Sequence, residues 1–310
     1  MNIQKKAISN LIRITVLSVS AFLLCSFMGC GGVSADTNGS DGDMHRSHIV
    51  VAGSTSVQPY AELLAEAYEK QYRGVKIDVT GGGSGAGIMS VQNGNAAIGM
   101  SSRDLKPAEQ ALLWPAVEIA KDGLAVIVHP KNPVWETGLT MSQIRDIYMG
   151  KIRNWDELSG FGDWKARTAR RHAEIHVITR EDGSGSRGAF QELVMGKGAD
   201  GKDNRIKSKA IVQNSNGAIR YLVADNPHAI GFVSLALVEV KEAGEKEVKA
   251  LALDGVDATP ENVKTGTYKL SRPFLFITKD EPKGLAKEFI DFVLSSEGKK
   301  ILEKEELIVG

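Results

Sequence analysis

A stretch of small, hydroxyl and charged residues near the middle of the chain, residues 179–188, has the composition of an anion-binding turn. A β-branched run at 176–178 precedes it, and an apolar i, i+3, i+4 pattern that starts at Phe190 follows, so we expect a strand, a turn and a helix. Amides in the first turn of that helix would be unpaired and would lie at the positive end of the helix dipole. The residues expected to donate to an anion are Arg180, Ser184, Gly185 and Ser186.

Arg180 brings a planar, permanently charged donor fork to this turn. Asp182 follows two residues later, and two roles are open for it: it could hold the Arg180 guanidinium in place, or it could cap the turn. Taken alone, the turn also fits an ordinary glycine-rich helix start with a serine as N-cap and no ligand. A binding site would require that other segments supply donors to the same point.

Two earlier segments repeat this order of strand, Gly/Ser turn and helix. The apolar run 49–52 ends in Gly53-Ser54-Thr55-Ser56, and Pro59 falls in the first turn of the expected helix, where its missing N–H costs nothing. The alternating run 75–79 leads into the glycine-rich stretch 81–87. Three helix N-termini that converge on one point would offer a small oxyanion many backbone donors with almost no bulk cation.

The first 29 residues have the layout of an export signal. They carry three basic residues and no acidic one, and the apolar stretch at 14–28 is too short for a comfortable membrane span. The segment 27–30 resembles a bacterial lipobox, with Phe27 where leucine is usual, so we expect Cys30 to become the lipidated first residue. Residues 30–47, rich in Gly, Ser, Asn and Asp, would form a flexible tether. We therefore expect an extracytoplasmic protein anchored to a bacterial membrane by lipid.

The body that follows the expected anchor has no cysteine, because Cys25 lies in the expected signal. A fold without disulfides must rely on its core, and 42% hydrophobic with 25% charged residues is ordinary globular composition. The chain has 38 basic and 38 acidic residues, and loss of the three basic residues of the signal would leave a net charge of about −3. This charge argues against a strongly basic nucleic-acid-binding protein.

Short apolar runs alternate with helical stretches along the body, which is typical of an α/β fold with a mostly parallel sheet. The continuous apolar run at 123–129 is closed by Pro130 and Pro133, and we interpret these prolines as a crossing into a second lobe. The predicted boundaries are 48–131 plus 246–310 for lobe I and 132–245 for lobe II. Two chain crossings between lobes would act as a hinge.

Five short motifs occur in order along the body. They are Gly53-Ser54-Thr55-Ser56, Gly83-Ser84-Gly85, Ile98-Gly99-Met100-Ser101-Ser102-Arg103, Tyr148-Met149-Gly150-Lys151-Ile152-Arg153-Asn154-Trp155 and Arg180-Glu181-Asp182-Gly183-Ser184-Gly185-Ser186. Together they resemble the phosphate-binding lipoproteins of bacterial ABC phosphate importers, across nearly all of residues 48–310. The resemblance implies a two-lobed periplasmic-binding-protein fold of type II, which closes on one inorganic phosphate in the cleft between its lobes and delivers it to a membrane permease.

Carried over motif by motif, the resemblance also implies the residues of the site. The ligand contacts would be Thr55, Ser56, Ser84, Ser102, Arg180, Ser184, Gly185 and Ser186, with Ser54 and Asp182 in support. It implies a monomeric receptor rather than an enzyme, with no cofactor and no nucleic acid. Its partners would be inorganic phosphate, the permease subunits of an ABC transporter, and a membrane through the lipid anchor only.

One position departs from the family pattern. Where many members have an aspartate that accepts a hydrogen bond from the proton of hydrogen phosphate, this chain has Ser102. A hydroxyl can both accept and donate a hydrogen bond, so it tolerates a protonated ligand without repelling an unprotonated one. Neighbouring Asp104 or Asp182 could supply the missing acceptor. Sulfate, molybdate and tungstate stay open as ligands, and we expect a narrower preference for phosphate over sulfate than in aspartate-bearing relatives.

Other classes of protein use parts of the same patterns. The chain has no G-x-x-x-x-G-K-[ST] motif and only the loose end of a dinucleotide fingerprint, which disfavours a nucleotide-binding enzyme. Residues 82–86 approximate the nucleophile elbow of a serine hydrolase, yet no histidine has a supporting motif. His172 and His176 would suit zinc only on a helix and with a third ligand, and we expect a strand there, so no metal site is predicted. A structural or adhesion protein would have no use for three anion-shaped turns.

Overall fold

The strands of both predicted lobes join into one mixed sheet. The computed structural model describes residues 47–158, 174–238 and 247–310, and in these ranges the strand order is β2-β1-β3-β9-β4-β7-β5-β6, with β8 paired to β4. The expected signal, Cys30 and all but the last residue of the tether lie outside the described residues, as does His172. No helix in the described ranges combines the length and the apolar character needed to cross a membrane.

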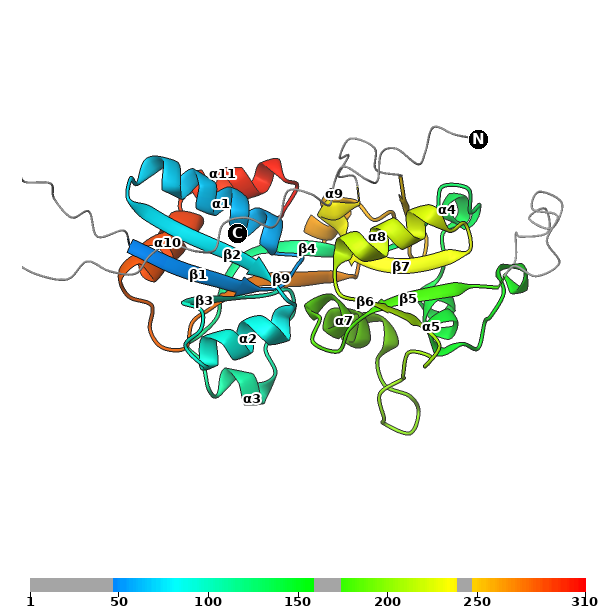
Figure 1. Ribbon diagram of the computed structural model, residues 1–310. Coiled ribbons are helices and arrows are strands. Elements are labelled where there is room, and N and C mark those ends of the chain that lie inside the picture. Colours follow the sequence, from blue (N-terminus) through cyan, green and yellow to red (C-terminus); the bar gives the residue numbers. More distant parts are fainter. Residues whose placement is uncertain (1–46, 159–173, 239–246) are drawn as a thin grey trace, which may run out of the picture. The chain divides into compact units, whose positions relative to one another are not determined.

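The first lobe is built on three parallel strands with β1 in the middle. These strands are β1 (Ser47–Gly53), β2 (Val75–Gly81) and β3 (Ile98–Ser101), and β9 (Ser271–Ile277) runs antiparallel to β3. The helices of this lobe are α1 (Gln58–Gln71), α2 (Ser84–Gln92), α3 (Pro107–Gln110), α10 (Gly284–Leu294) and α11 (Ser296–Lys304). Figure 1 shows α1 and α11 on one face of these strands and α2 on the other. Val51, Ile98, Phe276 and Phe289 are among the residues of the core between them.

The second lobe contains four further strands of the described ranges. These are β5 (His176–Arg180), β6 (Ile211–Gln213), β7 (Ala229–Ser234) and β8 (Lys249–Ala250), and β5 is parallel to both β6 and β7. Its helices are α4 (Val134–Thr137), α5 (Met141–Met149), α7 (Gly185–Phe190), α8 (Asn216–Asp225) and α9 (Pro260–Lys264). Short 3-10 helices lie at Trp155–Glu157 and Leu235–Leu237, and a π-helical turn lies at Gln191–Met195. At the centre of the core the rings of Phe190 and Phe232 stack with centroids 4.2 Å apart.

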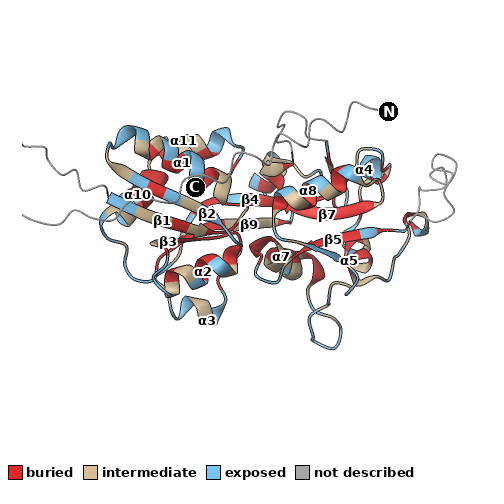
Figure 2. Cartoon of the chain, viewed as in Figure 1, coloured by how far each residue is buried: buried red, intermediate tan, exposed pale blue. Residues whose placement is uncertain are grey.

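Strand β4 (Val117–Val128) belongs to both lobes. Its first part pairs with β9, and its last five residues, Leu124–Val128, pair with β7 and are buried in the second core. Figure 2 shows this half of β4 and all of β7 as buried. The crossing therefore lies inside the strand, earlier than the predicted boundary after residue 131. The sequence does not show the position of this crossing, because a continuous buried strand has no break in composition where it passes from one core to the other.

The return to the first lobe also differs from the prediction. β8 pairs with the second-lobe half of β4, and Val248, Leu253 and Leu270 are buried in the second core. The segment that pairs again in the first lobe is β9, so the crossing lies near Ser271 rather than at residue 246. An apolar run such as 248–253 predicts a strand, but its composition does not say which lobe it joins.

Two helices follow one another near the end of the chain. α10 ends at Leu294 and α11 begins at Ser296, with Ser295 between them. The Ser295 hydroxyl accepts a hydrogen bond from the amide of Gly298 at 3.3 Å and so caps the second helix.

Candidate functional site

The predicted site residues lie where the parallel strands of each lobe end. In the first lobe β1, β2 and β3 lead into the turns that hold Ser54, Ser84 and Ser102, and α1 and α2 follow the first two. In the second lobe β5 leads through residues 181–184 into α7, and β6 leads through 214–215 into α8. The strand, turn and helix order expected for three turns is confirmed, and β6 with α8 adds a fourth. In open α/β sheets such strand ends are where ligands bind.

Hydroxyl groups from these turns form a buried set, which we call the serine cluster: Ser54, Ser56, Ser84, Ser102 and Ser186, each at most 2% exposed. Ser54 donates to Ser102 Oγ at 2.9 Å, and the Ser102 amide donates to Ser84 Oγ at 3.1 Å. Ser56 Oγ of the first lobe lies 3.1 Å from Ser186 Oγ of the second. The cluster therefore spans both lobes.

The cation in contact with this cluster is Arg272, which sequence analysis did not single out. It is the second residue of β9 and lies directly opposite Asp122 in the register with β4. Its Nε and Nη2 donate to Asp122 Oδ2 at 3.1 and 2.9 Å. Nη1 donates to Ser186 Oγ at 2.7 Å and Nη2 to Ser56 Oγ at 3.2 Å. One guanidinium thus donates to a hydroxyl of each lobe from a strand of the crossing.

Both charges of this pair are withdrawn from water, because the side chains of Arg272 and Asp122 are each 1% exposed. Burial lowers the pKa of the Arg272 guanidinium, and the charge of Asp122 opposes that shift. Burial raises the pKa of the Asp122 carboxyl, while Arg272, the Ser234 hydroxyl and the Ala236 amide lower it. Two guanidinium nitrogens and the Ser234 hydroxyl all donate to Asp122 Oδ2, which is the geometry of an ionised pair.

Arg180 is buried as well, in a separate ion pair. Its Nε and Nη2 donate to the two carboxylate oxygens of Glu181 at 2.9 and 2.8 Å, and Nη2 also donates to the carbonyl of Asn214 at 3.2 Å. Besides burial, the positive charge of Arg180 contributes to the lowered pKa of Arg272, so the two guanidinium groups act on each other. An anion held near both would relieve this repulsion.

Asp182 does not hold the Arg180 guanidinium, which was one of the two roles left open for it by the sequence. Its side chain is 92% exposed and pairs with Arg187 at 2.9 Å, while the neighbouring Glu181 reaches back to Arg180. Asp104, the other acceptor considered, is exposed. In a tight turn successive side chains point in different directions, and spacing alone could not tell which acidic residue faces inward.

Two members of the predicted set have structural tasks of their own. The Ser184 hydroxyl caps α7 by accepting from the amide of Arg187 at 3.2 Å. Gly185 faces the first lobe so closely that a Cβ there would lie 2.1 Å from Ser84 Oγ and 2.4 Å from Ser102 Oγ. Nearby, the Gly85 amide donates across the lobes to the carbonyl of Gly183 at 2.9 Å. Only a residue without a side chain fits at Gly185 while the lobes are in this contact.

Asn216, the first residue of α8, is a further residue that sequence analysis did not include in the site. It is 2% exposed, and its Nδ2 donates to Ser56 Oγ at 2.9 Å and to Thr55 Oγ1 at 3.4 Å. Its amide oxygen has no hydrogen-bond partner within the described part of the chain. The strand, turn and helix pattern around it was the signal that could have pointed to this residue.

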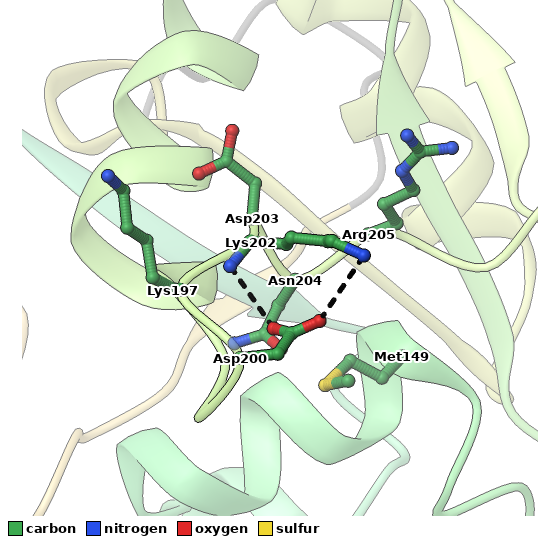
Figure 3. A pocket seen from close by; sticks show the side chains of 8 residues that line it. Met149, Lys197, Asp200, Lys202, Asp203, Asn204 and Arg205 are labelled. Atoms are coloured by element: carbon green, nitrogen blue, oxygen red, sulfur yellow. Dashed lines mark hydrogen bonds and ion pairs between the residues drawn. The ribbon is translucent and has the colours of Figure 1, made fainter.

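A separate surface hollow of about 760 Å³ lies on the second lobe. Figure 3 shows it between Met149 and the loop 197–205, with Lys202 paired to Asp200 at 3.9 Å. All but one of the loop's charged and amide side chains that line it are exposed. The hollow therefore lacks the buried, convergent donors that the serine cluster has.

Comparison with known proteins agrees with this geometry. A family model for the PBP superfamily domain matches residues 35–297. The chain belongs to this superfamily. A structure from Clostridium perfringens with bound phosphate, described as a phosphate ABC transporter substrate-binding protein, is 44% identical, with a TM-score of 0.73 over 85% of this chain and 100% of that one. An ABC-type phosphate transport receptor from Vibrio cholerae is 36% identical, with a TM-score of 0.65 over 84% of this chain and 100% of that one.

Among curated relatives, the phosphate-binding protein PstS of Bacillus subtilis is 28% identical over 294 residues, which cover 93% of this chain and 90% of the relative. The predicted α/β fold of the periplasmic-binding-protein type is therefore confirmed.

The buried ion pair yields a stability prediction. Arg272→Met should lower the free energy of unfolding by about 3–5 kcal/mol, because it leaves the Asp122 carboxylate buried without its cation. The double variant Arg272→Met/Asp122→Leu should recover much of this loss, since no uncompensated charge remains. Urea denaturation monitored by circular dichroism measures both values.

The matched control is Arg73→Met, which removes the charge of an exposed arginine and should change stability by less than about 0.5 kcal/mol. A single Arg272→Met variant as stable as the Arg73→Met control would refute the role given to the pair.

Proposed function

We propose that the protein is an extracytoplasmic receptor that binds inorganic phosphate and delivers it to the permease of an ABC transporter. The observation that carries this proposal is the convergence of buried hydroxyl and guanidinium donors from both lobes, at the ends of their parallel strands. The proposed contacts are Thr55, Ser56, Ser84, Ser102, Arg180, Ser184, Gly185 and Ser186, to which the geometry adds Arg272.

The site suits a small, strongly hydrated anion because it supplies many donors and little net charge. Arg272 is balanced by Asp122 and Arg180 by Glu181, so the ligand would be held mainly by hydrogen bonds. Micromolar affinity requires about −8 kcal/mol. Hydrogen bonds to charged groups contribute about 1.5–3 kcal/mol each, so a handful of them suffices after ordering costs.

The relatives favour phosphate among the tetrahedral oxyanions. The C. perfringens structure contains bound phosphate, and the V. cholerae structure is described as a phosphate transport receptor. Sulfate, molybdate and tungstate are the alternative ligands, and a phosphate-handling enzyme is the remaining alternative activity. We favour a receptor over an enzyme because the named relatives are binding proteins and receptors.

A titration tests the ligand. Isothermal calorimetry of the purified protein should show one phosphate bound per chain with a dissociation constant of about micromolar or lower. Sulfate, molybdate and tungstate are titrated in parallel, and tighter binding of one of these would replace phosphate in the proposal. If none of the four anions binds more tightly than about millimolar, the protein is not an oxyanion receptor.

The contact of Gly185 with Ser84 and Ser102, which we call the seam between the lobes, yields a second prediction. Gly185→Ala should weaken phosphate binding by about tenfold or more, because its Cβ would lie within 2.4 Å of two hydroxyl oxygens whenever the lobes are in contact. The same variant should show less compaction with phosphate in small-angle scattering than the wild-type protein. Gly183→Ala is the matched control in the same turn, since its Cβ would meet no atom within 4 Å. Equal affinities of the two variants would show that closure does not depend on this contact.

The proposed anchor is tested apart from the ligand. We propose that Cys30 carries the lipid, that residues 31–47 tether the body, and that the body acts as a monomer. Cys30→Ala should release the protein from membranes while the phosphate affinity stays unchanged, because the first described strand begins only at Ser47. Fractionation of cells followed by titration of the released protein measures both. Membrane retention of Cys30→Ala would rule out a lipid at this cysteine.

A further inference from the structure

The amide oxygen of Asn216 is a buried acceptor without a donor, beside the serine cluster. Asn216 is 2% exposed, and its Nδ2 lies 2.9 Å from Ser56 Oγ and 3.4 Å from Thr55 Oγ1. Oδ1 is thus the amide atom left for another donor, and it has none in the described chain. An unpaired buried acceptor destabilises the protein, and a hydrogen bond from a ligand would remove that cost.

The two carboxylates near the cluster already accept hydrogen bonds from the arginines. Asp122 Oδ2 accepts from Arg272 and from Ser234, and both carboxylate oxygens of Glu181 accept from Arg180. Ser102 Oγ accepts a hydrogen bond from the Ser54 hydroxyl, and its own O–H group is left to donate. Within the described part of the chain, Asn216 Oδ1 is therefore the buried acceptor beside the cluster that has no hydrogen-bond partner.

Tetrahedral oxyanions differ in whether they carry a hydrogen. Hydrogen phosphate has one O–H group that needs an acceptor, whereas sulfate has four bare oxygens and no hydrogen to give. Resting on the proposed function, we propose that Asn216 Oδ1 accepts the hydrogen of a protonated oxyanion and so makes the site favour hydrogen phosphate over sulfate. With sulfate bound, the amide oxygen would stay unpaired and would face another lone pair, which is how a site rejects an analogue that lacks a hydrogen.

Two substitutions move this preference in opposite directions. Asn216→Ala removes the acceptor, so the preference for phosphate over sulfate should fall by about five- to tenfold. Asn216→Asp keeps an acceptor at the same place and gives it a negative charge, which repels both dianions but accepts a stronger hydrogen bond from the O–H group of phosphate, so the preference should rise by about tenfold. Each variant also loses the hydrogen bond from Nδ2 to Ser56, but that loss weakens both anions alike and leaves their ratio unchanged.

Competition titrations in mildly alkaline buffer give the ratio directly, because free phosphate is then mainly a dianion, like sulfate, and differs from it by the O–H group. Gly217→Ala is the matched control on the same helix, since its Cβ would meet no atom within 4 Å, and its ratio should equal that of the wild-type protein. Thermal unfolding of each variant checks that it folds.

The outcomes separate this inference from the proposed function. Absence of phosphate binding by the wild-type protein would refute the receptor itself. Phosphate binding with the same phosphate-to-sulfate ratio in wild-type, Asn216→Ala and Asn216→Asp proteins would overturn only the role of Asn216. A ratio that falls in the alanine variant and rises in the aspartate variant supports it, and a merely structural role would not change the sign between the two.

Discussion

The ion pair between Arg272 and Asp122 is the interaction on which the arrangement of the site depends. It lies between β4 and β9, where the chain crosses between the lobes, and both side chains are 1% exposed. Burial of two charges costs several kcal/mol per ion, and a well-packed apolar pair in its place is often as stable or more so. Stability alone therefore does not explain why a buried ion pair occupies this position. The hydrogen bonds of the Arg272 guanidinium do, since Nη1 contacts Ser186 of the second lobe and Nη2 contacts Ser56 of the first.

This placement ties the hinge to the seam between the lobes. Asp122 holds the guanidinium in one orientation, so the donors aimed at the seam do not have to be ordered when the lobes close. The seam itself is polar and small in its side chains, as the contact of Gly185 with Ser84 and Ser102 shows. A few hydrogen bonds between hydroxyls and amides gain little over their bonds to water. Such a seam can open, and an anion that accepts from both sides adds the free energy that keeps it shut.

How far the sequence could predict this site depends on whether a residue's role is local. Glycine and serine turns between apolar runs follow from local backbone requirements, and the turns before α1, α2 and α7 were predicted for that reason. Arg272 and Asp122 could not be found in this way, because each is a single charged residue in a strand and meets its partner only through the register of β4 with β9. Asp122 lay just outside the apolar run 123–129 that was predicted as a strand, so it was not considered as a site residue. Glu181 rather than Asp182 holds the Arg180 guanidinium, and spacing could not show this because the direction of a side chain in a turn is set by backbone angles.

The charges of the site also indicate where discrimination between ligands must come from. Arg180 with Glu181 and Arg272 with Asp122 sum to no net charge, so attraction to negative charge alone distinguishes poorly among divalent oxyanions. The serine hydroxyls discriminate little as well, since each can rotate to donate or accept. The guanidiniums only donate, and the amide oxygen of Asn216 only accepts, so neither can change its role by rotating as a hydroxyl does. The orientation of the Asn216 amide is fixed because its Nδ2 lies against two hydroxyls. Selectivity in a neutral, desolvated seam therefore depends on matching the ligand's own hydrogen to a fixed acceptor. The guanidiniums can donate to any tetrahedral oxyanion, and the hydroxyls can reorient to suit each of them.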